Sequence, residues 1–298
     1  MSLLTEEYIE EYNKNGVIVI ENIFTNNEIL NTRIEFHKQL EKMDINHNNI
    51  LLGIDKPPSE YRIKGKPSRI FYADWKLKLH LDHKIYSTMK DLLINQYNTN
   101  NKQINPFGYF NDILPYIDRV CYRLPDHIRA EGGLSLHLDR NPLYPFEKLK
   151  KWKPIQAFIT LTDQYNEGLH VIKGFHNIID DYFKNNEEVK NNLSGGEFYR
   201  MNSKSYYNLQ QKLEPIYAPA GSLVIWDNRL PHSTGDNFIS NDSREVIYCG
   251  WIPNIELNKK YYENELINIK LNIPPPAYID NLGEVDRNWS IGSFPPFF

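Results

Sequence analysis

The sequence has little cysteine, no long apolar run and no excess of basic charge. Its two cysteines, Cys121 and Cys249, are too few for a disulfide framework and lack the spacing of zinc ligands. No run of about 18 apolar residues is present, so we expect no transmembrane helix. The first residues, MSLLTEEYIEEYNKNG, are acidic and amphipathic, which is not the pattern of a secretory signal. We therefore expect a cytoplasmic protein without a membrane partner.

The charge balance also narrows the classes of partner. The formal net charge of the 298 residues is −4, and this balance provides no basic face, so we expect no nucleic-acid partner. The hydrophobic share of 41% and the charged share of 24% are typical of a globular chain. An aromatic share of 13% suits a β-rich core.

The first 100 residues or so carry mainly helical patterns. Thr5 caps a predicted helix that ends near Gly16, and an apolar strand is expected at Val17–Ile20. Thr25 and Glu28 form the capping box of a second predicted helix. Apolar residues recur at helical spacing over 75–97, whereas 44–73 show no clear period and are expected to form a long connection.

The pattern changes from about residue 117 onward. Short apolar runs appear there, separated by Pro, Gly and Asn turns: RVCYRL, LSLHLD, PIQAFITL, LHVIKG, GSLVIWD and EVIYCGWI. Such runs predict a β-sandwich or barrel, and a helical pattern returns at 259–268. Without repeats or a linker, we expect a single domain over 1–298. It would have a helical part at about 1–100, a β core at about 105–255, and a C-terminal helix and tail at 256–298.

The tetrapeptide LHLD occurs twice, and His-x-Asp is the usual first half of a three-ligand iron site. In the first copy, the surrounding apolar residues predict a helix. Residues two apart on a helix point about 200° apart, so His80 and Asp82 cannot both reach one ion. We expect both to be solvated on a helix surface.

In the second copy, leucines alternate with Ser135, His137 and Asp139. A strand has a period of two, so His137 and Asp139 project from the same face and can converge on one metal ion. His232 is the best-placed third ligand, because it follows an apolar strand and a Pro turn that would set it at a rim. Two histidines and one carboxylate are typical of non-haem Fe(II) oxygenases, and zinc is the chemical competitor.

A chelating co-substrate would distinguish iron from zinc, and two residues could bind one. Arg244 lies twelve positions after His232 and begins the next apolar strand, where its guanidinium could bind a distal carboxylate bidentately. Thr234, two residues after His232, offers a hydroxyl to the same carboxylate.

With these residues in view, the chain resembles the phytanoyl-CoA dioxygenase-like family of Fe(II)/2-oxoglutarate oxygenases. The resemblance covers most of the chain. It rests on these segments: LTEEYIEEYNKNGVIVIENIFTNNEI, SLHLD, KPIQAFITLTDQYNEGLHVIKGFH and APAGSLVIWDNRLPHSTGDNFISNDSREVIYCGWIP. The departures are EGLH, where two glycines are usual, and KGFH, where the family has a Pro-Gly-Ser-His-type turn. Both touch a loop rather than the ligands, so they bear on substrate more than on chemistry.

The resemblance implies a mainly β fold with flanking helices around a double-stranded β-helix core (jelly roll, cupin-like). It implies that His137, Asp139 and His232 hold Fe(II), while Arg244 and Thr234 bind the 5-carboxylate of 2-oxoglutarate. The reaction would consume O₂ and 2-oxoglutarate, release succinate and CO₂, and hydroxylate a small or medium-sized organic substrate. Relatives that halogenate usually have a small residue in place of Asp139, so its presence implies hydroxylation.

Other functions and residues stay open at this stage. A peptide or protein hydroxylase of the same fold and a non-catalytic jelly-roll binding protein are the alternatives. Gln156 either faces the interior and contacts the co-substrate or is an amide satisfied within the core. Arg123, Arg140 and Arg229 lie near the predicted site in sequence, where they would suit an anionic substrate, but ordinary pairing on the surface is the better expectation.

Overall fold

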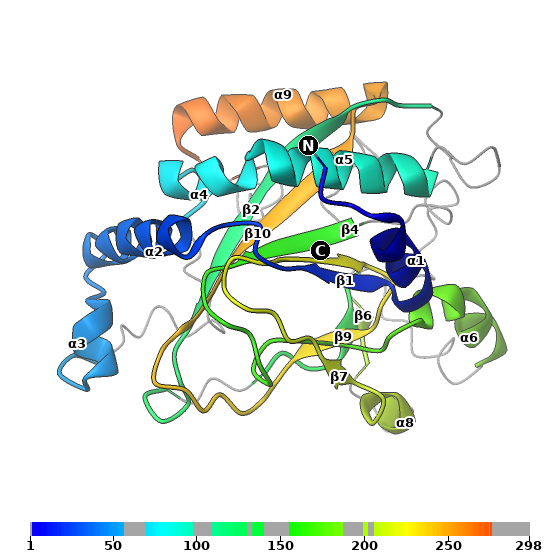
Figure 1. Cartoon of the computed structure of the whole chain (residues 1–298). Helices are drawn as coiled ribbons and strands as arrows, with labels where there is room; N and C mark the ends of the chain where they lie inside the picture. Colours follow the sequence, from blue (N-terminus) through cyan, green and yellow to red (C-terminus); the bar gives the residue numbers. More distant parts are fainter. Residues whose placement is uncertain are drawn as a thin grey trace.

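The computed structural model describes residues 2–56, 70–97, 109–129, 133–139, 155–186, 199–201, 206–273 and 275 (Figure 1). Within these ranges the fold consists of two five-stranded antiparallel sheets with flanking helices. This confirms the predicted mainly β class. No helix in the described ranges combines the length and the apolar character needed to cross a membrane.

The N-terminal elements form as their local sequence predicts. Helix α1 (Glu6–Asn15) is capped by Thr5 and ends at Gly16, whose φ of 74° places it in the left-handed region that glycine adopts without strain. Strand β1 (Val17–Ile20) follows directly. Helix α2 (Asn26–Glu41) begins with the predicted capping box, in which the Thr25 side chain accepts from the backbone of Glu28 while the Glu28 side chain accepts from that of Thr25.

The next segment differs from the sequence prediction in two places. A short helix, α3 (His47–Leu51), interrupts the expected connection over 44–73, of which 57–69 lie outside the described residues. The predicted helix over 75–97 is two helices, α4 (Asp74–His80) and α5 (His83–Tyr97). The expectation that His80 is solvated was wrong: its side chain is buried and its Nε2 lies 3.3 Å from the Gly250 carbonyl oxygen. Helix α4 packs against β10, so the helix surface that carries His80 is an internal one.

The first sheet has the strand order β1-β8-β4-β10-β2, and the second has the order β6-β3-β9-β5-β7. The remaining strands are β2 (Ile113–Arg123), β3 (His137–Leu138), β4 (Ile155–Thr160), β5 (Leu169–Val171), β6 (Tyr199–Arg200), β7 (Glu214–Pro215), β8 (Leu223–Asp227), β9 (His232–Thr234) and β10 (Arg244–Pro253). The smaller helices are η2 (Phe175–Asn177), α6 (Ile179–Asn185) and α8 (Tyr207–Gln210), and the C-terminal helix is α9 (Glu256–Leu271).

The path of the chain between the sheets identifies the fold. From β2 to β5 successive strands alternate between the first and the second sheet, and from β7 to β10 they alternate again. Two antiparallel sheets wound in this way form a double-stranded β-helix, or jelly roll. The fold implied by the family resemblance is therefore confirmed.

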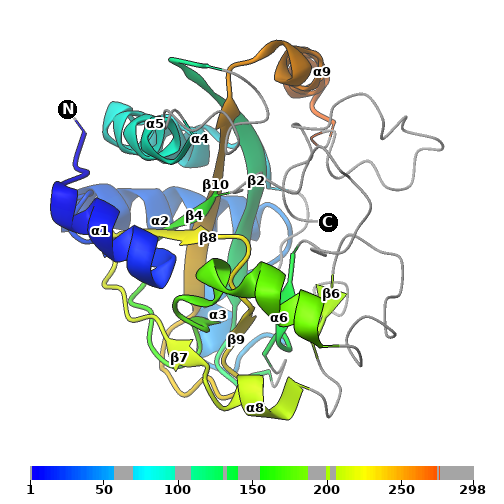
Figure 2. The same cartoon turned by 90° about the vertical axis from the view of Figure 1, so that its right-hand side faces the viewer.

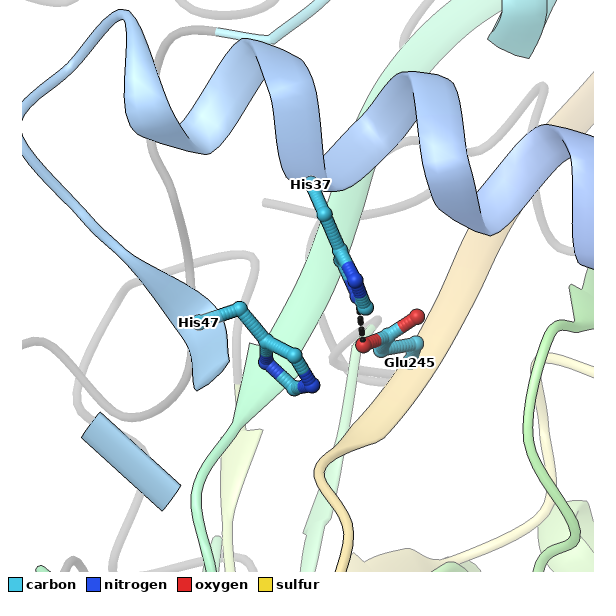
Figure 3. Close-up of side chains that lie close together, drawn as sticks. All are labelled: His37, His47 and Glu245. Carbon is cyan, nitrogen blue, oxygen red and sulfur yellow. Dashed lines mark hydrogen bonds and ion pairs between the residues drawn. The ribbon is translucent and has the colours of Figure 1, made fainter. Parts of the chain in front are cut away.

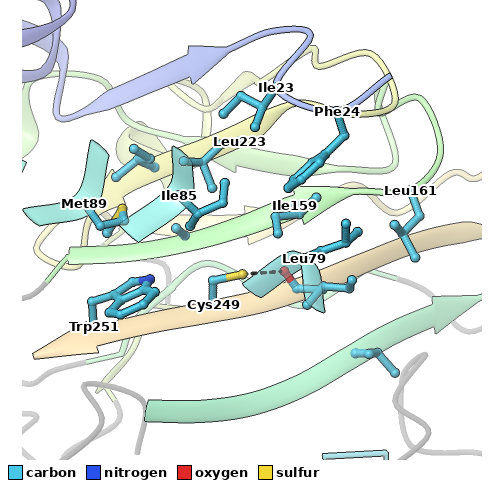
Figure 4. Packing of buried hydrophobic residues seen from close by; sticks show 14 of the residues in the cluster. Ile23, Phe24, Leu79, Ile85, Met89, Ile159, Leu161, Leu223, Cys249 and Trp251 are labelled. Atoms are coloured by element: carbon cyan, nitrogen blue, oxygen red, sulfur yellow. Dashed lines mark hydrogen bonds between the residues drawn. The ribbon is translucent and has the colours of Figure 1, made fainter. Parts of the chain in front are cut away.

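The first sheet has an apolar layer on each of its faces. Ile225 and Ile159 point toward the helices, while their neighbours Val224 and Phe158 point toward the second sheet, as the two-residue period of a strand requires. Figure 4 shows the helix-side layer, where Ile85 and Met89 of α5 pack on the sheet. Figure 2 shows the helices α2, α4 and α5 on one side of the first sheet and β9 on the other.

A buried carboxylic acid joins α9 to this sheet. Glu265 is 1% exposed, and its Oε1 accepts a hydrogen bond of 2.7 Å from the backbone N–H of Ile117 on β2. Burial raises the pKa of Glu265 to about 8 from its ordinary value of 4.5. Burial lowers the pKa of the neighbouring Lys76 to about 8. A group changes stability with pH only between its pKa in the unfolded and in the folded chain. Lys76 therefore acts mainly above pH 8, and Glu265 acts below pH 8.

We expect Glu265 to lower the free energy of unfolding as the pH rises from 5 to 8. The folded chain keeps Glu265 protonated in this window, whereas the unfolded chain releases the proton, so this contribution falls by an amount on the order of 3 kcal/mol. His80, whose pKa burial lowers to about 3 from 6.5, acts in the opposite direction below pH 6.5. Glu265→Gln keeps the acceptor for Ile117 and abolishes the titration, so urea unfolding of this variant should lack the loss that Glu265 causes. Glu256→Gln, at an exposed position of the same helix, is the matched control. Equal slopes for wild type and Glu265→Gln would contradict the assignment.

Candidate metal centre

Two short strands of the second sheet bring three metal-binding side chains together. His137 on β3 lies directly opposite His232 on β9 in the antiparallel register, and Asp139 follows β3. The Nε2 atom of His137 is 3.2 Å from Oδ1 of Asp139, and Nε2 of His232 is 3.5 Å from Oδ2. Ligand atoms of the three residues all lie within 4.8 Å of one another. The three residues predicted as ligands therefore converge.

Backbone carbonyl groups fix the orientation of both imidazoles. Nδ1 of His137 lies 2.7 Å from the Ser135 carbonyl oxygen, and Nδ1 of His232 lies 2.9 Å from that of Leu230. An Nδ1–H that donates to a carbonyl leaves Nε2 with a free lone pair. This is the usual arrangement of histidines that bind metals. Both Nε2 atoms face the Asp139 carboxylate.

Asp139 and His137 hold the protonation states that a cation requires, whereas His232 favours a proton. Burial acts to raise the pKa of Asp139, but His232 and His137 outweigh it and hold that pKa well below its ordinary value. Burial, together with the nearby His232, lowers the pKa of His137. The pKa of His232 is raised, because the adjacent Asp139 carboxylate outweighs its burial. An ionised carboxylate beside a neutral imidazole is ready to bind a metal ion, which would displace the proton favoured at His232.

Gln156 contacts the centre through Asp139. Its Nε2 donates a hydrogen bond of 2.8 Å to Oδ2 of Asp139, and its side chain is buried in the interior between the sheets. The sequence left two interpretations of Gln156 open: contact with the co-substrate, or an amide satisfied within the core. Neither of them included this hydrogen bond to the Asp139 carboxylate. The amide restricts the rotation of the carboxylate and leaves Oδ1 facing His137.

Arg244 is a buried cation at the start of β10. Arg244 is 3% exposed. Its Nε donates a hydrogen bond of 2.6 Å to Oε1 of Gln164, and its Nη1 lies 3.2 Å from Sγ of Cys121. Among the described residues, no carboxylate oxygen lies within 4.0 Å of the guanidinium. Tyr248 also hydrogen-bonds to the guanidinium, and Glu167 acts on its charge from a greater distance. A buried charge without a carboxylate in direct contact is costly. The arrangement thus fits a site for an anionic ligand.

Strand β4 connects Arg244 to the three converging residues. The Arg244 guanidinium carbon is 5.9 Å from the ring centre of Phe158, and Phe158 is two residues beyond Gln156 on the same face of β4. Two residues of a strand span about 6.6 Å. Arg244 and Asp139 therefore contact the same interior face of one strand within reach of a short ligand.

Thr234 lies on the same face of β9 as His232, two residues further on. Its Oγ1 accepts a hydrogen bond of 2.6 Å from the backbone N–H of Leu134. No hydrogen bond joins Thr234 to Arg244 in the part of the chain that the structure describes. Their shared role at one carboxylate stays a prediction.

Three other arginines were considered as contacts for an anionic substrate. Two of them bind protein groups, and the third is not described. Arg123 donates to the Gly235 carbonyl at 2.7 Å and pairs with Asp126 at 3.3 Å. Arg229 forms a two-pronged ion pair with the buried Asp227. Both arginines therefore form ordinary ion pairs, as we expected. The expected place on the surface was wrong for Arg123, which is buried at 4% exposure, and the Arg229 side chain is 25% exposed. Arg140 lies outside the described residues.

Two of the side chains that hold Arg244 could not be predicted from the sequence. Cys121 is a buried free thiol on β2, and no sign of its contact with Arg244 is present in the sequence. Gln164 follows β4 in a polar turn segment, and its sequence context gives no signal for a buried contact with an arginine 80 positions later. Only the folded arrangement brings these groups together.

Comparisons with known proteins support the fold. No protein-family model matches the sequence, and no curated protein matches it either. Among solved structures, GlcNAc Inducible Gene 2 (GIG2) of Candida albicans is similar with a TM-score of 0.67 and 17% identity, over 97% of this chain and 72% of that one.

Two bacterial structures are similar to a comparable degree. A putative oxidoreductase from Salmonella typhimurium LT2 has a TM-score of 0.67 and 15% identity, over 91% of this chain and 76% of that one. The hypothetical protein JW0805 from Escherichia coli has a TM-score of 0.64 and 15% identity, over 91% and 75%. At such identities the likeness establishes a shared fold and no more.

We expect Gln156→Leu to weaken metal binding while the chain stays folded. The substitution removes the amide that orients Asp139, and loss of such an outer partner costs about 10- to 100-fold in metal affinity. Equilibrium dialysis against Fe(II) under argon measures the change. Gln96→Leu is the matched control, because Gln96 is a buried amide that bonds to Asn13 away from the centre. Unchanged iron affinity in Gln156→Leu would show that the contact with Asp139 has no such role.

Proposed function

We propose that this protein is an Fe(II)- and 2-oxoglutarate-dependent dioxygenase that hydroxylates a small or medium-sized organic substrate. One observation carries the proposal: a buried His-Asp-His cluster and a buried arginine without a carboxylate partner contact the same interior strand face. A metal site alone would not require the arginine, and an anion site alone would not require the cluster.

The donor set fits iron. His137, Asp139 and His232 would occupy one face of the ion, which leaves positions for a chelating co-substrate and for dioxygen. Zinc accepts the same three ligands. A zinc-dependent hydrolase, however, gives Arg244 no ligand to bind, whereas a keto-diacid co-substrate gives it one.

The remaining residues would orient 2-oxoglutarate. Arg244 would bind its 5-carboxylate with two parallel hydrogen bonds, while Gln164 and Cys121 hold the guanidinium in place. When bound, the iron supplies the chemistry that couples decarboxylation of 2-oxoglutarate to succinate and CO₂ with hydroxylation of a C–H bond. Phe158 and Trp226, 5.6 Å apart between ring centres, line the interior and would exclude water.

Asp139 bears on the type of reaction. The resemblance to phytanoyl-CoA dioxygenase-like enzymes, in which halogenating relatives usually lack the carboxylate, supports hydroxylation. Coenzyme A esters are not implied as substrates, because no residue in the described ranges points to a nucleotide-binding site.

Succinate formation is the direct test of the reaction. Protein supplied with Fe(II), 2-oxoglutarate and O₂ should release succinate slowly without a substrate and faster with an accepted one from a panel of organic compounds. Asp139→Ala should abolish both rates, because it removes a ligand of the iron. A folded, iron-loaded protein that forms no succinate under any of these conditions would favour the non-catalytic binding protein.

We expect Arg244→Lys to weaken 2-oxoglutarate binding by roughly tenfold or more, since lysine keeps the charge but loses the planar fork. Iron affinity should not change. Anaerobic calorimetry in the presence of Fe(II) measures the binding. Arg119→Lys, on the neighbouring strand β2, is the matched control, because Arg119 lies next to Asp118 on a partly exposed edge. An unchanged 2-oxoglutarate affinity in Arg244→Lys would refute the assignment.

A further inference from the structure

A second cluster of metal-binding side chains lies on the opposite face of β10. His37 of α2, His47 of α3 and Glu245 of β10 converge there, as Figure 3 shows, with one ligand atom from each within 4.8 Å of the others. Nε2 of His37 is 2.7 Å from Oε1 of Glu245, and the two imidazole rings stack with their centres 3.8 Å apart. Glu245 directly follows Arg244 and therefore faces the helices rather than the interior.

Neighbouring groups fix the positions of the His47 imidazole and of the Glu245 carboxylate. Nδ1 of His47 lies 2.9 Å from the Tyr122 hydroxyl, which leaves Nε2 available, and that Nε2 is 3.6 Å from Oδ1 of Asp242. Glu245 is fully buried; Arg33 donates to its Oε2 at 2.9 Å, and the hydroxyl of Ser243 donates to its Oε1. Metal-binding histidines and carboxylates typically have such outer partners.

Two carboxylates and one guanidinium meet at this cluster. Arg33 pairs with both carboxylates: its Nε lies 2.9 Å from Oε2 of Glu245, and its Nη2 lies 2.8 Å from Oδ2 of Asp242. One guanidinium balances only one of two ionised carboxylates, so one negative charge remains for a further cation.

One protonated imidazole can supply the missing charge, but this accounts for only one of the two histidines. The second must then stay neutral, because two imidazoles stacked at 3.8 Å repel each other when both are cations. An ordinary ion-pair network explains why Arg33 contacts both carboxylates, but it gives no reason for two histidines from separate helices at the same point. A single divalent ion would use both imidazoles and both carboxylates as ligands.

We propose that His37, His47 and Glu245 bind a divalent transition metal of the zinc type, with Asp242 as the fourth ligand. Imidazole nitrogens and carboxylate oxygens in fourfold coordination are a common donor set for zinc. The ion has a route from solvent, because the Asp242 side chain is 43% exposed and, with Arg33, lines a surface cavity. Bound there, it would join α2 and α3 to the start of β10. This site is separate from the iron centre of the proposed function.

The test uses a variant that lacks the first centre. Metal-free His137→Ala/Asp139→Ala protein should bind one equivalent of Zn²⁺ in competition with a chromophoric chelator, and its thermal unfolding midpoint should rise on binding. Because this variant cannot form the proposed iron centre, its zinc binding reports on the second cluster alone. A folded variant that binds no Zn²⁺ would overturn the proposal.

Two further measurements locate the ion. His47→Gln on the same background should weaken zinc binding by at least about 100-fold, since loss of even an outer partner costs 10- to 100-fold. His170→Gln, at a histidine that contacts only the Asn166 carbonyl in the described chain, should leave it unchanged. X-ray absorption of the Zn²⁺-loaded double variant should show two imidazole ligands. A spectrum with oxygen ligands only would overturn the proposal even if His47→Gln fails to fold.

Discussion

The candidate metal centre depends on one strand pairing: β3 and β9 run antiparallel, with His137 directly opposite His232. This register sets the imidazole rings 4.1 Å apart between centres, and the turn of the chain after β3 brings Asp139 between them. A shift of the pairing by one residue would turn the side chains of one strand to the other face of the sheet and separate the three donors. The jelly roll supplies the rigid support for this pairing, because each strand of the site is hydrogen-bonded within the second sheet or covered by the first.

The interior between the sheets contains polar groups that a purely structural core would avoid. Asp139, Gln156 and Arg244 are buried among apolar and aromatic side chains, where each lowers stability unless it has a partner. Gln156 is paired with Asp139, but the contacts of Arg244 are with an amide oxygen, a thiol and the Tyr248 hydroxyl, and none of these is a carboxylate. Local departures from good core chemistry concentrate at functional sites. Buried charged groups lie on both faces of β10. Arg244 faces the interior between the sheets, whereas Glu245 faces the helices, because successive residues of a strand point to opposite faces. These two adjacent residues therefore belong to two separate clusters.

Much of the fold and the main cluster could be predicted because their signals are local. The caps of α1 and α2 need only a few neighbouring residues, and the alternation around His137 distinguished the second LHLD from the first. The burial of His80 could not be predicted, because it depends on the packing of α4 against β10. The cluster of His37, His47 and Glu245 joins three elements, two of which are more than 190 positions apart, and no local pattern reports such a meeting. The contacts of Gln156 with Asp139 were missed for the same reason.

The most direct test of the central claim is an anaerobic optical titration of the metal-free protein. We predict that Fe(II) alone gives no visible absorption and that adding 2-oxoglutarate produces the weak charge-transfer band of a keto acid chelated to iron. The band should saturate at one equivalent of each. A protein that binds Fe(II) and 2-oxoglutarate without developing this band would contradict the claim, because the keto-diacid would then be bound away from the metal held by the His-Asp-His cluster.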